Sequence, residues 1–181
     1  MNANEKIFIR NATPDDAAAV ARIQAAGWEH AFRGIFSDDY LNNQIKRKLE
    51  SAEWRAEMYR KGVGINIVAI DKSSKVIGHA DGSKQDWQDD IPETEKVWQL
   101  YALYIDPDYI GLGAVALPLV KEFAKRVATA GFDTFIAETV SESRAQKLYE
   151  KMGGRKVGEF ASESYENLQE TRFEFDVKRF L

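Results

Sequence analysis

The stretch from Leu103 to Arg126, LYIDPDYIGLGAVALPLVKEFAKR, constrains the fold more than any other part of the chain. It opens as the end of an alternating strand pattern, which Asp106–Pro107 stops because proline cannot donate to a β-ladder. Gly111 and Gly113 come next. Apolar residues then recur at helical spacing, at Val120, Phe123, Ala124 and Val127. A strand that enters a helix through glycines aims free N–H groups and the helix dipole at one point, so the segment predicts a phosphate-binding turn.

The spacing of this turn separates the families that use such a motif. A Walker loop ends in Gly-Lys-Ser/Thr and a dinucleotide fingerprint needs three glycines, and neither pattern is present. The segment Leu103–Tyr109, LYIDPDY, resembles the strand end that precedes the acetyl-CoA loop of the GNAT N-acetyltransferases. Gly113 matches the central glycine of that loop. Ile110 and Val115 depart from it, because the family usually has Gln or Arg at the first position and Gly or Ala at the second.

Two further segments resemble the same family, in the family's order. Residues 148–155, LYEKMGGR, followed by Val157-Gly158-Glu159, resemble its Phe/Leu-Tyr-Glu-Lys-Leu-Gly segment. The aromatic segment Trp28–Phe36 resembles the region after the first helix in one GNAT subgroup. Together these pieces touch most of the chain.

The resemblance implies an α/β (α+β) GNAT fold, with a mixed, mostly antiparallel twisted sheet flanked by helices, in a single domain over residues 1–181. The residue patterns agree with that order of elements. Strands are expected at 6–11, 63–70, 75–81, 96–105, 132–140, 155–160 and 167–177. Helices are expected from Thr13 to Gly27, over 38–60 in two pieces, from the glycine turn to Gly131, and from Ser141 to Lys151.

The family resemblance also implies which residues hold acetyl-CoA. The cofactor-binding residues would be Leu103, Tyr104, Ile105, Ile110, Gly111, Leu112, Gly113, Ala114, Val115, Ser143 and Tyr149. A backbone N–H within 103–105 would meet the thioester carbonyl, and the pantetheine arm would pass Thr139 and Val140. Ser143 or Glu142 stands where the family usually has an asparagine that donates to the cofactor.

Tyr149 matches the family tyrosine whose hydroxyl lies near the sulfur and can act as general acid for the departing thiolate. The alternative is an aromatic side chain packed on its helix. We interpret Tyr149 as catalytic.

The resemblance implies three residues on the side of the site where the amine acceptor would bind. Trp28 and Phe32 would form part of the wall around the amine, although both also suit a hydrophobic core. Gln99 stands where the subgroup often has a glutamate, and an amide cannot take a proton. The general base is therefore unassigned, and the candidates are water, Glu138, His79 and His30.

Two other features leave alternatives open. If the central helix began at Leu112, Pro118 would disrupt it; if Pro118 were its first residue, Ala114 to Leu117 would belong to the loop. The acidic run from Asp86 to Glu95 reads as a solvated loop or as a lip that attracts cationic amines.

Composition narrows the function classes. A net charge of −4 without a Lys/Arg cluster argues against nucleic acid as a partner. The chain has no cysteine and no metal-spaced ligand set, so we expect no metal, disulfide or thiol chemistry. The start MNANEKIF has no apolar leader and no apolar run approaches a membrane span, so no membrane partner and a cytoplasmic location are expected.

The sequence thus predicts an N-acetyltransferase that moves an acetyl group from acetyl-CoA, as co-substrate, to a primary amine of a small molecule or protein. The first alternative is a weakened or inactive acyl-CoA-binding module, favoured by Ile110, Val115, Pro118 and Gln99. The second is a structural protein without ligand, and a homodimer is left open.

Overall fold

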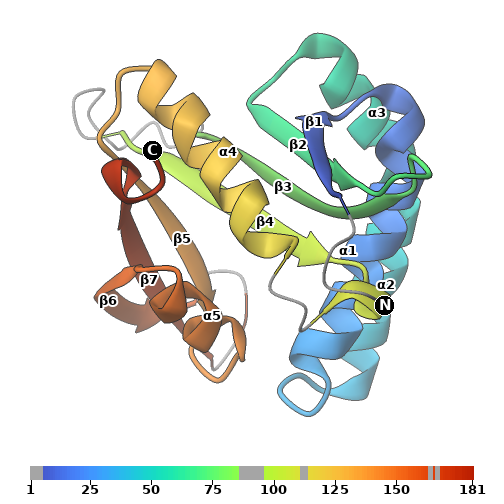
Figure 1. The fold of residues 1–181 in the computed structure, drawn as a ribbon. Helices are drawn as coiled ribbons and strands as arrows, with labels where there is room; N and C mark the ends of the chain where they lie inside the picture. Colours follow the sequence, from blue (N-terminus) through green and yellow to red (C-terminus); the bar gives the residue numbers. More distant parts are fainter. Residues whose placement is uncertain (1–5, 86–95, 111–113, 163–164, 166–167) are drawn as a thin grey trace.

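The computed structural model describes residues 6–85, 96–110, 114–162, 165 and 168–181, and its strands form one seven-stranded sheet in the order β1-β2-β3-β4-β5-β7-β6 (Figure 1). The strands are β1 (Phe8–Asn11), β2 (Ile65–Ile70), β3 (Val76–Lys84), β4 (Trp98–Ile105), β5 (Thr134–Val140), β6 (Arg155–Ala161) and β7 (Gln169–Asp176). The helices are α1 (Ala17–Phe32), α2 (Asp38–Glu50), α3 (Ala52–Lys61), α4 (Ala116–Thr129) and α5 (Ala145–Lys151). In the described ranges no helix is both long and apolar enough to cross a membrane.

The parallel pairing of β4 with β5 makes the sheet a mixed one. All other neighbours are antiparallel, and β4 and β5 are parallel, which confirms the predicted mixed, mostly antiparallel sheet. Their ladder joins only Trp98–Leu100 to Phe135–Ala137. β4 continues to Ile105 beside β3, while β5 continues to Val140 beside β7. The two central strands therefore part in the second half of β4.

Helices cover both faces of this sheet. On β2, Ile67 and Ala69 face a core that includes Val120 and Phe123 of α4, whereas Val68 packs against the other face with residues of α1. Because successive side chains of a strand point to opposite faces, α1 and α4 lie on opposite sides of the sheet (Figure 1).

Helix α1 is longer than the sequence analysis expected. We predicted that it would end at Gly27, but it continues to Phe32 and includes Trp28. Gly27 lies within the helix because its missing side chain leaves room for the ring of Tyr104, with which any Cβ would overlap. The aromatic segment after Gly27 is therefore mostly the last turn of a helix.

The start of α4 differs from both alternatives that the sequence left open. The helix begins at Ala116, so Pro118 is its third residue. Backbone N–H groups of a first turn have no partner within the helix, so the missing donor of Pro118 costs little. The first regular bond is donated by Leu119 to Val115, over 3.3 Å. Pro118 thus fits the start of the helix without disrupting it.

Candidate functional site

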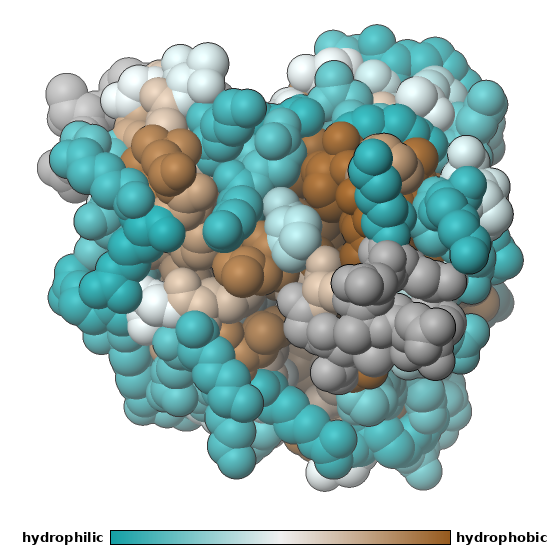
Figure 2. All heavy atoms as spheres, in the orientation of Figure 1, coloured by the Kyte–Doolittle hydropathy of each residue, from teal (hydrophilic) through white to brown (hydrophobic). Residues whose placement is uncertain are grey.

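A cavity of about 670 Å³ lies where β4 and β5 part. Its wall combines the end of α1, the second half of β4, the start of α4, the end of β5 and one side of α5. Figure 2 shows apolar side chains among polar ones on the face of the molecule that α4 covers, and most of the residues in the cavity wall are apolar or aromatic. The parting of two neighbouring strands has thus produced a mainly apolar cavity in the centre of the sheet.

The cavity brings together most of the predicted site residues. Those in its wall are Trp28, Phe32, Gln99, Leu103, Tyr104, Ile105, Ile110, Val115, Ser143 and Tyr149. Ala114 is exposed and is not part of the wall. Gly111, Leu112 and Gly113, and the acidic run from Asp86 to Glu95, lie outside the described residues.

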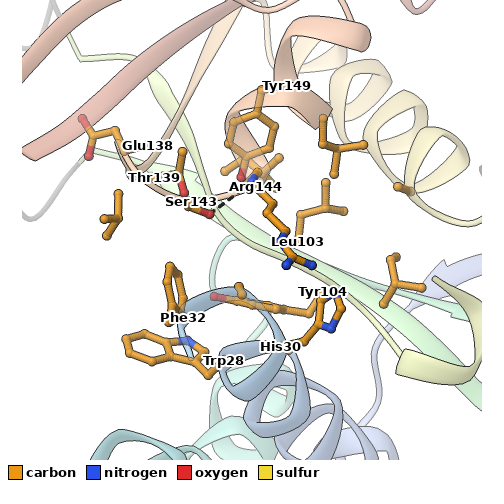
Figure 3. Close-up of a pocket in the computed structure, with 18 of the residues that line it drawn as sticks. Trp28, His30, Phe32, Leu103, Tyr104, Glu138, Thr139, Ser143, Arg144 and Tyr149 are labelled. Carbon is orange, nitrogen blue, oxygen red and sulfur yellow. Dashed lines mark hydrogen bonds between the residues drawn. The ribbon is translucent and has the colours of Figure 1, made fainter. Parts of the chain in front are cut away.

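Tyr149 is held on α5 with its ring packed and its hydroxyl directed into the cavity (Figure 3). Its ring meets Phe173 and Phe175 edge-on, at centroid distances of 5.6 and 5.8 Å. Burial raises the pKa of Tyr149 to about 12. The hydroxyl is therefore protonated at neutral pH and can donate a hydrogen bond. The ring of Tyr149 is thus packed on its neighbours while its hydroxyl lies in the cavity, so the packing does not exclude the catalytic role that the sequence analysis set against it.

Ser143 has a structural task at the start of α5. Its side chain is buried, and its Oγ accepts a hydrogen bond from the backbone N–H of Ala145 over 3.1 Å. The N–H of Ser143 itself bonds the carbonyl of Val140, so the chain turns here and α5 begins at Ala145, later than the predicted Ser141. The hydroxyl proton of Ser143 is still available to the cavity.

A cluster of polar side chains that includes Gln99 and Glu138 of the cavity wall joins the strands β4, β5 and β7. Glu138 of β5 accepts a hydrogen bond from Gln99 Nε2 of β4 over 2.9 Å, and its other oxygen pairs with Arg172 Nε of β7 at 2.6 Å. A carboxylate thus lies beside Gln99, where the resembled subgroup often has a glutamate. Both oxygens of this carboxylate are therefore engaged by neighbouring side chains.

The two histidine candidates differ in their access to the cavity. His30 is exposed at the end of α1 and belongs to the cavity wall. His79 is fully buried, is not in the wall and stacks on the ring of Tyr104 at 5.7 Å. Its Nδ1 lies 3.0 Å from Asp81, which is in turn bound by Arg55 at 2.9 Å. The sequence analysis missed this buried group, because Arg55 on α3 is distant in sequence from His79 and Asp81 on β3.

Aromatic rings form the α1 side of the cavity. Trp28 meets Phe32 at 4.9 Å, stacks with Phe36 at 6.0 Å and meets Tyr165 at 6.1 Å. Trp28, Phe32 and Tyr165 also line the cavity. The same residues therefore act as core and as wall, which the sequence had offered as alternatives.

The two residues that depart from the family's acetyl-CoA loop, Ile110 and Val115, lie in different surroundings. Ile110 is partly exposed in the wall, whereas Val115 is 2% exposed and packs in the core below α4. A Cβ at Gly78 of β3 would lie 3.0 Å from Val115 Cγ1, so this side chain points at the sheet. The branched side chain of Val115 is thus directed inward and does not block the turn. Among the described residues, no group of three or more His, Cys, Asp or Glu side chains could hold a metal ion.

Comparison with known proteins decides the family. The model of the acetyltransferase (GNAT) family matches residues 29–154, which run from the last turn of α1 to the end of α5 and contain Tyr149. The chain belongs to this family. A search of curated proteins finds no match for this chain.

Solved structures share the GNAT fold at low sequence identity. The PaiA N-acetyltransferase of Thermoplasma acidophilum, solved in complex with coenzyme A, has a TM-score of 0.72 at 18% identity, with 94% of this chain and 99% of that chain covered. YncA of Salmonella typhimurium, solved with acetyl-CoA, has a TM-score of 0.66 at 18% identity over 95% and 94% of the two chains. An N-acetyltransferase from Staphylococcus aureus has a TM-score of 0.64 at 19% identity over 95% and 99%. At this identity the likeness concerns the fold.

Proposed function

We propose that this GNAT-family chain transfers an acetyl group from acetyl-CoA to a primary amine of a small molecule or protein. One observation carries the proposal: the strands β4 and β5 part after Leu100, and the hydroxyl of Tyr149 points into the cavity that this creates. The two GNAT structures solved with coenzyme A or acetyl-CoA support the choice of donor.

The second half of β4 suits the arm of the donor. Alternate residues of a strand direct their N–H and C=O groups to the same side, and those that face away from β3 have no ladder with β5 beyond Leu100. Backbone groups within 103–105 would hold the arm and polarise the thioester carbonyl, with Thr139 and Val140 on the other side. A preorganised N–H that meets a developing oxyanion is a strong source of catalysis.

Tyr149 would stabilise the leaving thiolate. The amine nitrogen attacks the carbonyl carbon, the carbon–sulfur bond breaks, and the sulfur leaves with the electron pair. A tyrosine with a pKa raised to about 12 is a weaker acid than an ordinary thiol, whose pKa is roughly 8.5. Tyr149 is therefore better suited to donate a hydrogen bond to the sulfur than to give up its proton completely.

The amine would enter beside the aromatic wall. Trp28, Phe32 and Tyr165 offer apolar surface to the rest of the acceptor, while Gln99 and Glu138 lie across the cavity. The proton that the amine loses must go to a base in the wall or to water.

The test is release of free thiol from acetyl-CoA, followed with a thiol reagent, across a panel of primary amines. Mass spectrometry of the product shows whether nitrogen carries the acetyl group. Amine-dependent thiol release with an N-acetylated product is expected. Hydrolysis of acetyl-CoA that does not depend on amine, or an O-acetylated product, would contradict the proposal.

A second candidate is CoA binding without turnover. It is favoured by Gln99, which cannot act as base, and by the engagement of Glu138 with Arg172. This candidate predicts that CoA raises the melting temperature while no amine in the panel causes thiol release.

A further inference from the structure

The carboxylates in the wall of the cavity already have partners. Glu138 is bound by Arg172 and Gln99, at 2.6 and 2.9 Å. Glu170 accepts a hydrogen bond from Ser162 Oγ over 2.6 Å. Both oxygens of Glu138 and one oxygen of Glu170 are thus engaged by neighbouring side chains.

The cations of the same wall are in a different state. Arg144 and Lys151 both line the cavity, and neither forms a hydrogen bond or an ion pair with any residue in the part of the chain that the structure describes. Arg144 and Lys151 thus have no counter-charge among the described residues, whereas Glu138 is paired with a cation and Glu170 accepts a hydrogen bond from a serine. An anionic group of a ligand would find its counter-charge here.

Arg144 is the cation that reaches into the middle of the cavity. It follows β5 in the turn that leads to α5, and Figure 3 shows its side chain extending past Leu103 toward the side on which Tyr104 and His30 lie. That side is formed by α1, which also carries Trp28 and Phe32. The guanidinium and the aromatic wall therefore face the same space.

We infer that Arg144 binds a carboxylate of the acceptor, which makes the acceptor a small apolar amine that carries a carboxylate, such as a hydrophobic α-amino acid. A guanidinium presents two parallel N–H groups to a carboxylate, and the rings beside it suit an apolar side chain. The inference rests on the proposed function, because it names the substrate class of the same site.

The phosphates of CoA are the other anions that could reach this cavity. The turn that the family uses for phosphate follows the end of β4 and begins at Ile110, whereas Arg144 extends beside Leu103, in the middle of the cavity. The position of Arg144 thus favours the acceptor over the phosphates. Lys151, at the far end of α5, is separated from Arg144 by almost two helical turns.

The test compares matched ligands that differ only in the carboxylate. L-Leucine and L-phenylalanine, and the primary amide of each, are titrated by calorimetry into the protein saturated with CoA. We expect each acid to bind about 10- to 100-fold more tightly than its amide, the range for hydrogen bonds to a charged group. Arg144→Gln should bring acid and amide to near equality, and Arg144→Lys should give an intermediate preference because it keeps the charge but loses the paired donors.

Lys147→Gln is the matched control, since it removes one positive charge from the same helix at an exposed residue outside the cavity wall. It should leave the preference for the acids unchanged. CoA is titrated separately into every variant. Equal binding of acid and amide to the natural protein would overturn the inference. So would an Arg144→Gln variant that weakens both ligands equally and also weakens CoA, because Arg144 would then serve the phosphates.

Turnover separates this inference from the proposed function. If the acids bind through Arg144 but no thiol is released from acetyl-CoA, the carboxylate site stands and the proposed transfer fails. If thiol is released with the amides as fast as with the acids, the transfer stands and the inference about Arg144 is wrong.

Discussion

Gly27 of α1 and Tyr104 of β4 lie in direct contact, and the tyrosine ring fills the space that a side chain at position 27 would occupy. The same ring stacks on the buried His79 at 5.7 Å. Tyr104 is thereby fixed between a helix and a strand with part of its surface in the cavity. The distance between α1 and β4, and hence the width of the cavity, depends on the absence of one methyl group.

Gly27→Ala tests this contact. In most helices alanine is more favourable than glycine by about 1 kcal/mol. Here we expect the opposite, a loss of roughly 1–3 kcal/mol in the free energy of unfolding, because the new methyl group must displace the ring. Urea unfolding measures the change, and Ala18→Gly, at an exposed position of the same helix, gives the ordinary propensity effect as control. A Gly27→Ala variant that is more stable than the natural protein would show that the ring moves without cost.

Tyr149→Phe removes the hydroxyl and keeps the ring that packs on Phe173 and Phe175. We expect kcat to fall roughly 10- to 1000-fold, as for a lost donor to developing charge, with little change in CoA affinity. Steady-state kinetics and calorimetric titration of CoA measure the two quantities. Since the hydroxyl stays protonated far above neutrality, the natural enzyme should not lose activity through Tyr149 below about pH 10. An unchanged kcat in the Phe variant would make Tyr149 a purely structural residue.

Stability should fall at alkaline pH because of the buried tyrosines. Burial raises the pKa of both Tyr149 and Tyr165 to about 12, whereas in an unfolded chain a tyrosine ionises near a pKa of about 10. Between these values the unfolded chain releases protons that the folded chain keeps, so rising pH favours unfolding. The loss should be on the order of 1 kcal/mol per pH unit for each tyrosine. Urea unfolding at about pH 9 and about pH 11 measures it, and Tyr149→Phe should reduce the drop; an identical drop in the variant would contradict the assignment.

His30 and Glu138 are the two candidates for the base from the sequence analysis that lie in the cavity wall. Glu138 is bound by Arg172 and Gln99, whereas His30 has no hydrogen-bond or ion-pair partner among the residues described. We therefore expect His30→Gln to lower kcat by about 100-fold in steady-state kinetics, because the amide that replaces the imidazole cannot take the proton of the amine. Glu138→Gln should mainly change stability by leaving Arg172 unpaired. If Glu138→Gln lowers kcat by this factor and His30→Gln leaves it unchanged, the carboxylate is the base.

Much of the fold follows from local signals in the sequence. Ser37 accepts a hydrogen bond from the N–H of Tyr40 over 3.3 Å and begins α2 as expected, and α2 and α3 are separate helices. Gly131 follows α4 with a φ of 88°, a backbone angle that only glycine adopts easily. Gly27 was misread because a glycine at a helix end and a glycine at a close contact look the same in one sequence. The partner that distinguishes them, Tyr104, is distant in the chain.

The candidate site was predictable where a motif fixes a local geometry and unpredictable where side chains meet across the sheet. The strand end at 103–105 and Tyr149 came from such motifs, and both line the cavity. The contact of Glu138 with Gln99 and Arg172 depends on the register of three strands, which no local pattern encodes. Arg144 was missed because an arginine near the start of a helix carries no signal until the cavity beside it is known.

The turn before α4 separates two substitutions that the sequence would have grouped together. Val115→Gly, suggested by the usual Gly or Ala of the family, should not improve CoA binding, because Val115 is buried and points at Gly78. We expect it to cost about 2–4 kcal/mol of unfolding free energy through a lost core contact and a more flexible start of α4.

Ile110 is 42% exposed in the cavity wall, so Ile110→Arg can place a charge there without emptying the core. A charged hydrogen bond to phosphate is worth about 1.5–3 kcal/mol, so Ile110→Arg should tighten CoA by about 10- to 100-fold, and added salt should reduce the gain. Calorimetric titration of CoA at matched salt, with Ile110→Leu as the uncharged control, measures the effect. If Ile110→Arg gains nothing over Ile110→Leu, the phosphates lie away from position 110 and the turn holds them by its backbone alone.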